Sequence, residues 1–223
     1  MKKSIWENLI VCPGAYYDPN AEKRKRDFLK NFDNNARLLD LGSGDQKLHD
    51  RAICLDIKPF TNVNVVGDAH FLPFKDNSFD GVVSFGVLEH TRRPWNIIKE
   101  VYRVTKKERT VFIGVPFIQG YHPAPGTTED MYRFTTEGLD YLCESVGRFT
   151  RIESGIGGGP ASAAAWILRE FLLSFIPNFW VLKTLFYSIF GCLTFWIKYF
   201  DYFLMKSSQN HKIYSSAYFI GKK

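Results

Sequence analysis

Short apolar runs that alternate with helical patterns constrain the fold of this chain most strongly. Five such runs occupy residues 37–41, 52–56, 63–66, 81–85 and 110–115. Several are apolar throughout, which is typical of strands buried on both faces of a parallel sheet. Residues 94–103 and 135–146 show helical spacing, and Thr135 or Thr136 is suited to cap the second helix. The pattern predicts an α/β fold with a doubly wound parallel sheet.

A glycine-rich loop signal at residues 155–160 precedes an abrupt change of composition. Residues 171–206 contain 13 of the chain's 36 aromatic residues. Their charged residues are Lys183, Lys198, Asp201 and Lys206. The longest uncharged part has 14 residues, whereas one helix needs about 20 to cross a bilayer. We also expect Pro177 and Gly191 to interrupt this segment.

This aromatic segment favours a monotopic or re-entrant helical pair at a membrane. The residues expected at the headgroup level are Lys183, Lys198, Trp180, Trp196, Tyr199 and Tyr202. An oligomer interface and a lid of apolar helices are the alternatives. Charge supports the membrane reading: residues 1–160 carry 22 Lys and Arg against 21 Asp and Glu, and residues 161–223 carry 7 against 2. We therefore expect an anionic membrane surface, and no nucleic acid, as a partner.

The cysteines and the N-terminus predict a cytoplasmic protein, which the aromatic segment would make peripheral or monotopic at the inner face of the membrane. The four cysteines are Cys12, Cys54, Cys143 and Cys192. They are widely spaced, which indicates reduced thiols and no zinc-type pair, and no metal site is predicted. The first residues contain no apolar run of signal-peptide length.

A buried strand runs into a glycine-rich turn at residues 38–44, Leu-Leu-Asp-Leu-Gly-Ser-Gly. Glycine allows the backbone to approach a ligand closely, because no Cβ intervenes and positive φ is accessible. Asp56 ends the next strand, 16 residues after Asp40. An acid at that position can accept hydrogen bonds from both hydroxyls of a ribose.

Further motifs follow in order along the chain. They are Gly67-Asp68-Ala69, Leu72-Pro73-Phe74, Ser78-Phe79-Asp80 and Leu88-Glu89-His90. Together with the glycine-rich turn, this set resembles the class I S-adenosylmethionine-dependent methyltransferases, in particular the small-molecule branch with type 11-like domains. The resemblance is strong over residues 37–115 and weaker beyond. It implies S-adenosyl-L-methionine as cofactor and a small-molecule or lipid-linked methyl acceptor.

The resemblance also implies a three-layer sandwich on a seven-stranded, mostly parallel Rossmann-like sheet. Residues 149–154 would form strand six, and residues 215–221 would form an antiparallel strand seven. The implied domains are a helical lead-in at 1–36, a methyltransferase core at 37–160, an apolar helical insertion at 161–210 and the final strand within 211–223. The insertion would then overhang the entrance for the acceptor.

Site residues follow from the resemblance, position by position. Asp40, Gly42, Ser43 and Gly44 would line the methionine part of the cofactor, and Asp56 would hold the ribose. Asp68 would bond the adenine amino group with Ala69 beside it, Phe85 would lie near the sulfonium, and Ile57 is also expected to bind the cofactor. His122, Tyr132 and Arg133, in a loop after strand five, and His90, at the mouth of the cleft, are the candidate acceptor-side catalytic residues. For His90 and Arg133, structural roles are equally compatible with the sequence, and Asp80 is read as ordering the turn into strand four.

Departures from the family pattern keep other functions open. Gln46 replaces the third glycine, residues 44–56 are too few for a full first helix, and the basic turn predicted at residues 103–109 lacks the usual glycines. A nicotinamide enzyme would need Gly-x-Gly-x-x-Gly, in which the last glycine is missing here. The remaining alternatives are a catalytically silent scaffold and a soluble methyltransferase whose apolar segment is an oligomer interface.

Overall fold

The computed structural model describes residues 14–123 and 129–223, which form two compact units. The sheet unit comprises residues 20–117, 121–157 and 216–223, and the helical unit comprises described residues up to 19, residues 118–120 and residues 158–215. The predictions that involve Cys12 and the absence of a signal peptide lie outside the described residues. The same holds for Ala124 and Pro125 of the predicted acceptor loop.

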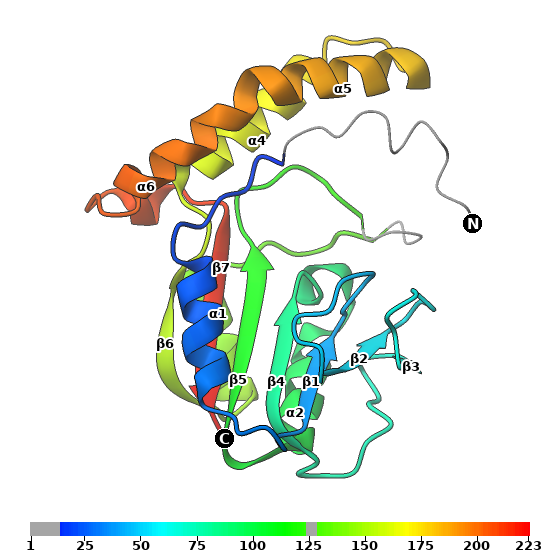
Figure 1. The fold of residues 1–223 in the computed structure, drawn as a ribbon. Coiled ribbons are helices and arrows are strands. Elements are labelled where there is room, and N and C mark those ends of the chain that lie inside the picture. The colour runs from blue at the N-terminus through cyan, green and yellow to red at the C-terminus, as the bar shows by residue number, and fades with distance from the viewer. Residues whose placement is uncertain (1–13, 124–128) are drawn as a thin grey trace. The chain divides into compact units, whose positions relative to one another are not determined.

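The sheet unit is built on seven strands in the order β3-β2-β1-β4-β5-β7-β6 (Figure 1). The strands are β1 (Leu38–Leu41), β2 (Ile53–Asp56), β3 (Val65–Val66), β4 (Phe79–Phe85), β5 (Thr105–Pro116), β6 (Thr150–Ile156) and β7 (Ser216–Lys222). Strands β1 to β5 pair in parallel, and β7 pairs antiparallel with both β5 and β6. The predicted doubly wound, mostly parallel seven-stranded sheet is confirmed.

Helices cover both faces of this sheet and complete the predicted three layers. On one face lies α1 (Ala21–Lys30), whose Phe28 belongs to a core cluster with Val83, Phe112, Tyr218 and Ile220. The opposite helices are α2 (Pro94–Val104) and α3 (Thr136–Tyr141), which continues as a π-helical turn η2 (Leu142–Val146) (Figure 1). Thr135 is the N-cap of α3, since its hydroxyl accepts a hydrogen bond from the Gly138 N–H at 3.0 Å.

The basic block before β5 is not the turn that the sequence predicted. Strand β5 begins at Thr105, directly after α2, and four residues bulge out where β4 contributes only Asp80. Buried Asp80 explains the bulge: its carboxylate lies 2.9 Å from the Lys106 ammonium and 3.3 Å from the Arg109 guanidinium. It also accepts a hydrogen bond from the Arg37 N–H at 3.0 Å, so its role is to join the starts of β1, β4 and β5.

The helical unit contains a helical hairpin followed by short helices. Its elements are α4 (Pro160–Leu173), α5 (Trp180–Thr194), η3 (Phe195–Phe200), α6 (Asp201–Leu204) and η4 (Asn210–Lys212). Pro177 lies in the connection between α4 and α5, as expected. The expectation that Gly191 interrupts the segment is wrong, because Gly191 is buried within α5. The helical run Trp180–Leu204 has 25 residues and is, among the described residues, the single helix long and apolar enough to cross a membrane by length and composition.

A buried carboxylate fixes the start of this hairpin. Asp201, at the start of α6, is fully buried, and its two oxygens accept hydrogen bonds from the N–H groups of Gly159, Ala161 and Ser162 at 2.8–3.1 Å. These N–H groups belong to the first turn of α4, which has no acceptor in its own helix. Asp201 therefore caps α4 from about 40 residues further along the chain.

Candidate cofactor and acceptor site

The carboxyl ends of β1, β2 and β4 bring most of the predicted cofactor residues to one edge of the sheet. The turn after β1 needs its glycines: Gly42 has a φ of +73°, and a Cβ there would lie 2.1 Å from the Val87 side chain. Gly44 has a φ of +58°, and no atom lies within 4 Å of the position of its Cβ. Backbone at Gly44 is thus open to a ligand.

Two aspartates shape this turn through its backbone. Asp56 links it to β2, since one carboxylate oxygen accepts from the Gly44 N–H and the other from the Lys58 N–H, each at 3.0 Å. Asp40 is buried and accepts from the Leu48 N–H at 2.9 Å, and burial raises the pKa of its carboxyl. Through this bond Asp40 helps to order residues 45–52. These residues form turns and bends, which confirms that the segment is too short for a full first helix.

The remaining predicted cofactor residues continue along the same edge. Asp68 is exposed after β3, and its carboxylate accepts from the His70 N–H at 2.8 Å. Burial opposes the ionisation of Asp68, but hydrogen bonds from His70 outweigh it and lower the pKa. Phe85 ends β4 with 43% of its surface exposed and packs edge-to-face on Phe112 at 4.9 Å.

These features fit an S-adenosylmethionine molecule lying along the edge. Open backbone at Gly44 suits the methionine part, the Asp56 carboxylate suits ribose hydroxyls, and the exposed Phe85 ring suits a cation such as the sulfonium. The hydroxyl of Ser43 is buried at the same turn, beside the Cys54 thiol. Ile57, which follows Asp56, is exposed, and Ala69, which follows Asp68, is half-buried.

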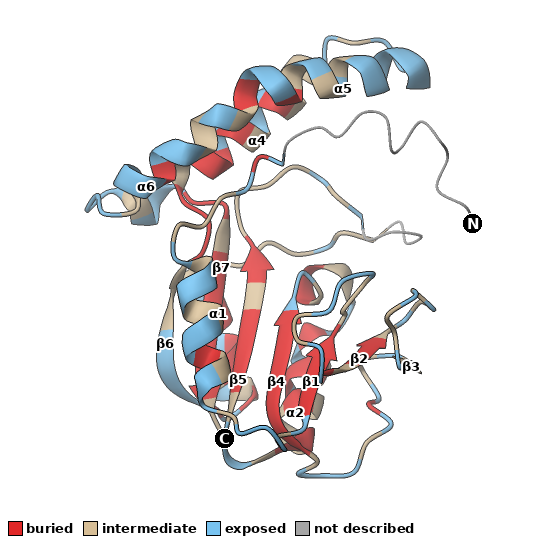
Figure 2. Cartoon of the chain, viewed as in Figure 1, coloured by how far each residue is buried: buried red, intermediate tan, exposed pale blue. Residues whose placement is uncertain are grey.

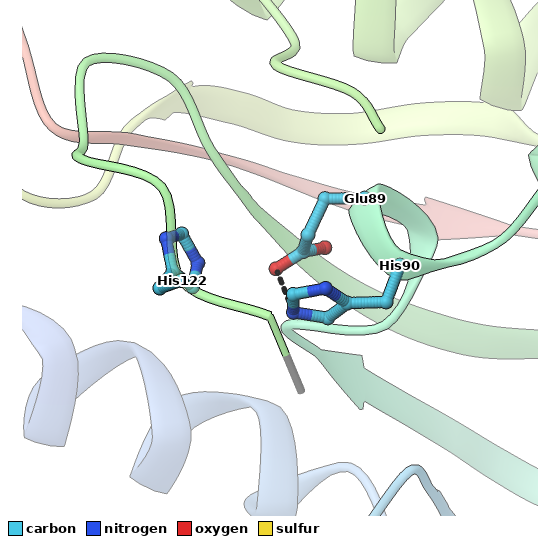
Figure 3. Close-up of side chains that lie close together, drawn as sticks. All are labelled: Glu89, His90 and His122. Atoms are coloured by element: carbon cyan, nitrogen blue, oxygen red, sulfur yellow. Dashed lines mark ion pairs between the residues drawn. The ribbon is translucent and has the colours of Figure 1, made fainter. Parts of the chain in front are cut away.

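A second cluster begins at η1 (Leu88–His90), the short helix that follows β4 (Figure 3). Glu89 is only 1% exposed, and burial raises the pKa of its carboxyl to about 7. One of its oxygens, Oε2, has no hydrogen-bond partner within the described part of the chain. The other, Oε1, lies 3.8 Å from Nε2 of His90. A buried carboxyl group that lacks partners is costly to the fold and therefore marks a candidate functional group.

The loop after β5 supplies the other members of this cluster. Asp130 is fully buried at its side chain and binds both terminal nitrogens of Arg133 at 2.6 Å, and these bonds lower its pKa to about 2 against the opposing effect of burial. The same carboxylate accepts from the His122 N–H at 2.7 Å. Nδ1 of His122 lies 3.4 Å from the Arg133 guanidinium. Arg133 is thus held in an ion pair beside His122.

The structure brings three of the four predicted acceptor-side residues together. The rings of His90 and His122 meet at right angles with centroids 5.5 Å apart, and Arg133 adjoins His122. Burial lowers the pKa of His90, whose Nδ1 lies 3.0 Å from the Glu129 carbonyl. Tyr132 differs: its hydroxyl donates to the Arg92 carbonyl at 3.2 Å.

Two members of the cluster were not among the predicted site residues. Glu89 was visible only as the middle of the Leu-Glu-His motif, and Asp130 only as one acid in a mixed loop. Their roles depend on burial, which sequence does not display for acidic residues. An acid next to a histidine at the end of a buried strand is the one signal that singles out Glu89.

Comparisons with known proteins agree with this geometry. Residues 39–113 match the family model described as a methyltransferase domain. The chain is 35% identical over 103 residues to the ubiquinone/menaquinone biosynthesis C-methyltransferase UbiE of Dinoroseobacter shibae. This match covers 40% of each chain. It is 30% identical over 139 residues to the UbiE of a Ruegeria species, which covers 56% of this chain and 52% of that protein. The chain thus spans about half, or less, of the length of these relatives.

Solved structures show the same fold at low sequence identity. The [4+2]-cyclase SpnF superposes with a TM-score of 0.58 at 15% identity, covering 98% of this chain and 90% of its own. Phosphoethanolamine N-methyltransferase 2 of Haemonchus contortus, in complex with S-adenosyl-L-methionine, gives 0.56 at 17% identity, covering 90% of this chain and 52% of its own. Residues 39–113 are therefore similar to a methyltransferase domain, and the edge of the sheet that they form fits S-adenosylmethionine as the cofactor.

Proposed function

We propose that this protein transfers a methyl group from S-adenosylmethionine to a small, lipid-linked acceptor at a membrane surface. In this reaction an acceptor atom attacks the sulfonium methyl carbon, the carbon–sulfur bond breaks with its electrons going to sulfur, and the acceptor loses a proton. The single observation that carries the methyl-transfer part is the turn from Gly42 to Gly44, bonded through Asp56 and open at Gly44. Alignment of the methyl group and exclusion of water supply most of the rate in such transfers.

The relatives support an apolar acceptor class. Both are named as C-methyltransferases of ubiquinone and menaquinone biosynthesis. We infer a quinone-like or other lipid-linked ring as the acceptor here, methylated at carbon. His122 and Arg133 follow β5 at the same sheet edge as Phe85, which supports their predicted place on the acceptor side.

The helical unit supports a membrane location for this reaction. The run Trp180–Leu204 is apolar, and much of its surface is exposed (Figure 2). The large apolar side chains there that are more than half exposed are Trp180, Val181, Leu193, Trp196, Tyr202 and Phe203. Leaving so many in water is unfavourable at about 25 cal/mol per Å², so a bilayer is the partner we infer.

Incorporation of labelled methyl groups by the full chain tests both the methyl transfer and the lipid-linked acceptor. Tritiated methyl groups from S-adenosylmethionine should enter the organic phase of a bacterial lipid extract, and Asp56→Ala should abolish most of this incorporation. Asp50→Ala, an exposed acid without a role in the turn, is the matched control. Calorimetry should show one cofactor site. If the folded chain shows no heat with millimolar cofactor, the silent-scaffold reading replaces the enzyme.

Liposome flotation tests the membrane location separately. The full chain should float with anionic vesicles and less with zwitterionic ones, because residues 161–223 carry a basic excess. A chain that stays in the soluble fraction without detergent and scatters light as a dimer would instead favour the oligomer-interface reading.

A further inference from the structure

We propose that Glu89, His90 and His122 form a binding site for one divalent transition-metal ion. Each of the three residues offers one ligand atom, and these atoms all lie within 4.8 Å of one another (Figure 3). Metal binding is a property separate from methyl transfer, and it can be measured without a methyl acceptor.

The distances require only a small closure around an ion. Zinc binds histidine nitrogen at about 2.0–2.1 Å and carboxylate oxygen at about 2.0–2.2 Å, so tetrahedral ligand atoms stand about 3.4 Å apart. Oε1 of Glu89 and Nε2 of His90 are already 3.8 Å apart. His122 lies on a loop and its side chain is 28% exposed, so it is the ligand least enclosed by packing.

The second observation is the state of Glu89. Its carboxyl group is buried, and Oε2 has no hydrogen-bond partner among the described residues. A buried carboxyl oxygen without a partner is unfavourable to the folded state. A cation bound by Glu89 removes that cost, because it supplies the missing partner.

The surroundings orient the ligands as metal sites require. A metal-bound histidine usually donates its other ring N–H to a carbonyl or carboxylate. The Nδ1–H of His90 donates a hydrogen bond to the Glu129 carbonyl at 3.0 Å, which leaves the lone pair of Nε2 on the side of Glu89. The ion pair of Arg133 with Asp130 is neutral as a unit, so Glu89 is the group of this cluster whose negative charge a bound cation would balance.

The ligand types select the ion. Two imidazoles and one carboxylate suit zinc, iron, cobalt or manganese better than magnesium or calcium, which prefer oxygen ligands. Three protein ligands also leave at least one coordination position open to water or another oxygen, as in catalytic sites. An ion there would occupy the lone pairs that a general base needs, so His90 and His122 would orient groups rather than remove protons.

Calorimetric titration of the metal-free full chain with Zn²⁺, followed by Co²⁺ absorption spectra, tests the site. We expect one saturable site per chain, with Kd raised at least about tenfold by Glu89→Gln and by His122→Ala. Both substitutions should also remove the visible bands of tetrahedral Co²⁺. His211→Ala, an exposed histidine in the helical unit, is the control and should leave the Kd unchanged.

Three results would overturn the proposal. One is the absence of saturable binding at micromolar Zn²⁺. Another is an equal Kd for the wild type and His122→Ala, a loop variant chosen because it should fold even if Glu89→Gln does not. The third is a loss of binding in His211→Ala, which would move the site to the helical unit. None of these results depends on the methyl acceptor.

Discussion

Replacing Asp201 should destabilise the helical unit more than any other single acidic substitution in it. Its carboxylate accepts three hydrogen bonds, at 2.8 Å from Ala161 and at 2.9 Å and 3.1 Å from Ser162 and Gly159. Hydrogen bonds to a charged group contribute about 1.5–3 kcal/mol each. The carboxylate also complements the positive end of the α4 dipole. Because the three bonds share one group, we expect a total loss of about 4 kcal/mol in Asp201→Ala.

Asp201→Asn separates the two contributions. An asparagine keeps one acceptor oxygen but presents an NH2 group to the remaining N–H donors, so we expect a loss of about 2 kcal/mol. Urea unfolding followed by tryptophan fluorescence reports on this unit, since Trp166, Trp180 and Trp196 all lie in it. Hydrogen exchange of peptides from α4 should show faster exchange in the first turn.

The control is Asp50→Ala, which removes an exposed acid from the sheet unit. If Asp201→Ala unfolds at the same urea concentration as this control, the buried cap does not hold α4. If exchange rises equally in the β4 and β5 peptides, the two units unfold together, and the local assignment of the loss is refuted.

Three further substitutions address the sheet unit. Asp56→Ala should weaken S-adenosylmethionine binding by about 1.5–3 kcal/mol in calorimetry, because a charged acceptor is lost, and an unchanged Kd would remove Asp56 from the ribose site. Gly42→Ala should lower the thermal midpoint through its positive φ and the contact with Val87, and Val87→Ala should partly restore it; no restoration would leave backbone strain as the sole cause. Burial opposes the ionisation of Asp80, but Lys106, the Arg37 N–H and Arg109 lower its pKa, so the stability it contributes is present above about pH 4 and lost as pH falls through the lowered value. The stability difference between wild type and Asp80→Asn should therefore shrink in acid unfolding curves, and a constant difference from pH 7 to pH 3 would contradict this assignment.

The sequence predicted the sheet because its central strands are short and mostly apolar. Strands β1 and β4 are buried along almost their whole lengths, and such runs have few alternatives in a chain of this composition. The cap at Thr135 was predictable for a similar reason, since capping depends on residues three positions apart.

The errors arose where tertiary contacts outweigh local preference. Glycine inside a helix costs only about 1 kcal/mol, and buried packing around Gly191 is enough to offset it. The residues after α2 lengthen β5 because Lys106 and Arg109 must reach buried Asp80, a contact that no local pattern reveals. The sequence did not single out Glu89 and Asp201, because acidic residues are usually expected at the surface and both of these are buried.

The pairing of β6 with β7 separates the register of the sheet from the helical unit between these strands. Strand β6 runs parallel to β5, so its carboxyl end and the start of β7 lie at the same edge as the glycine-rich turn. The β6–β7 pairing continues to Ile156 and Ala217, and the Gly157 N–H donates to the Ser216 carbonyl at 2.9 Å. The hydrogen-bonded ladder therefore closes directly before the helical unit begins, so bonds within the sheet fix the register of β6 and β7 on both sides of that unit.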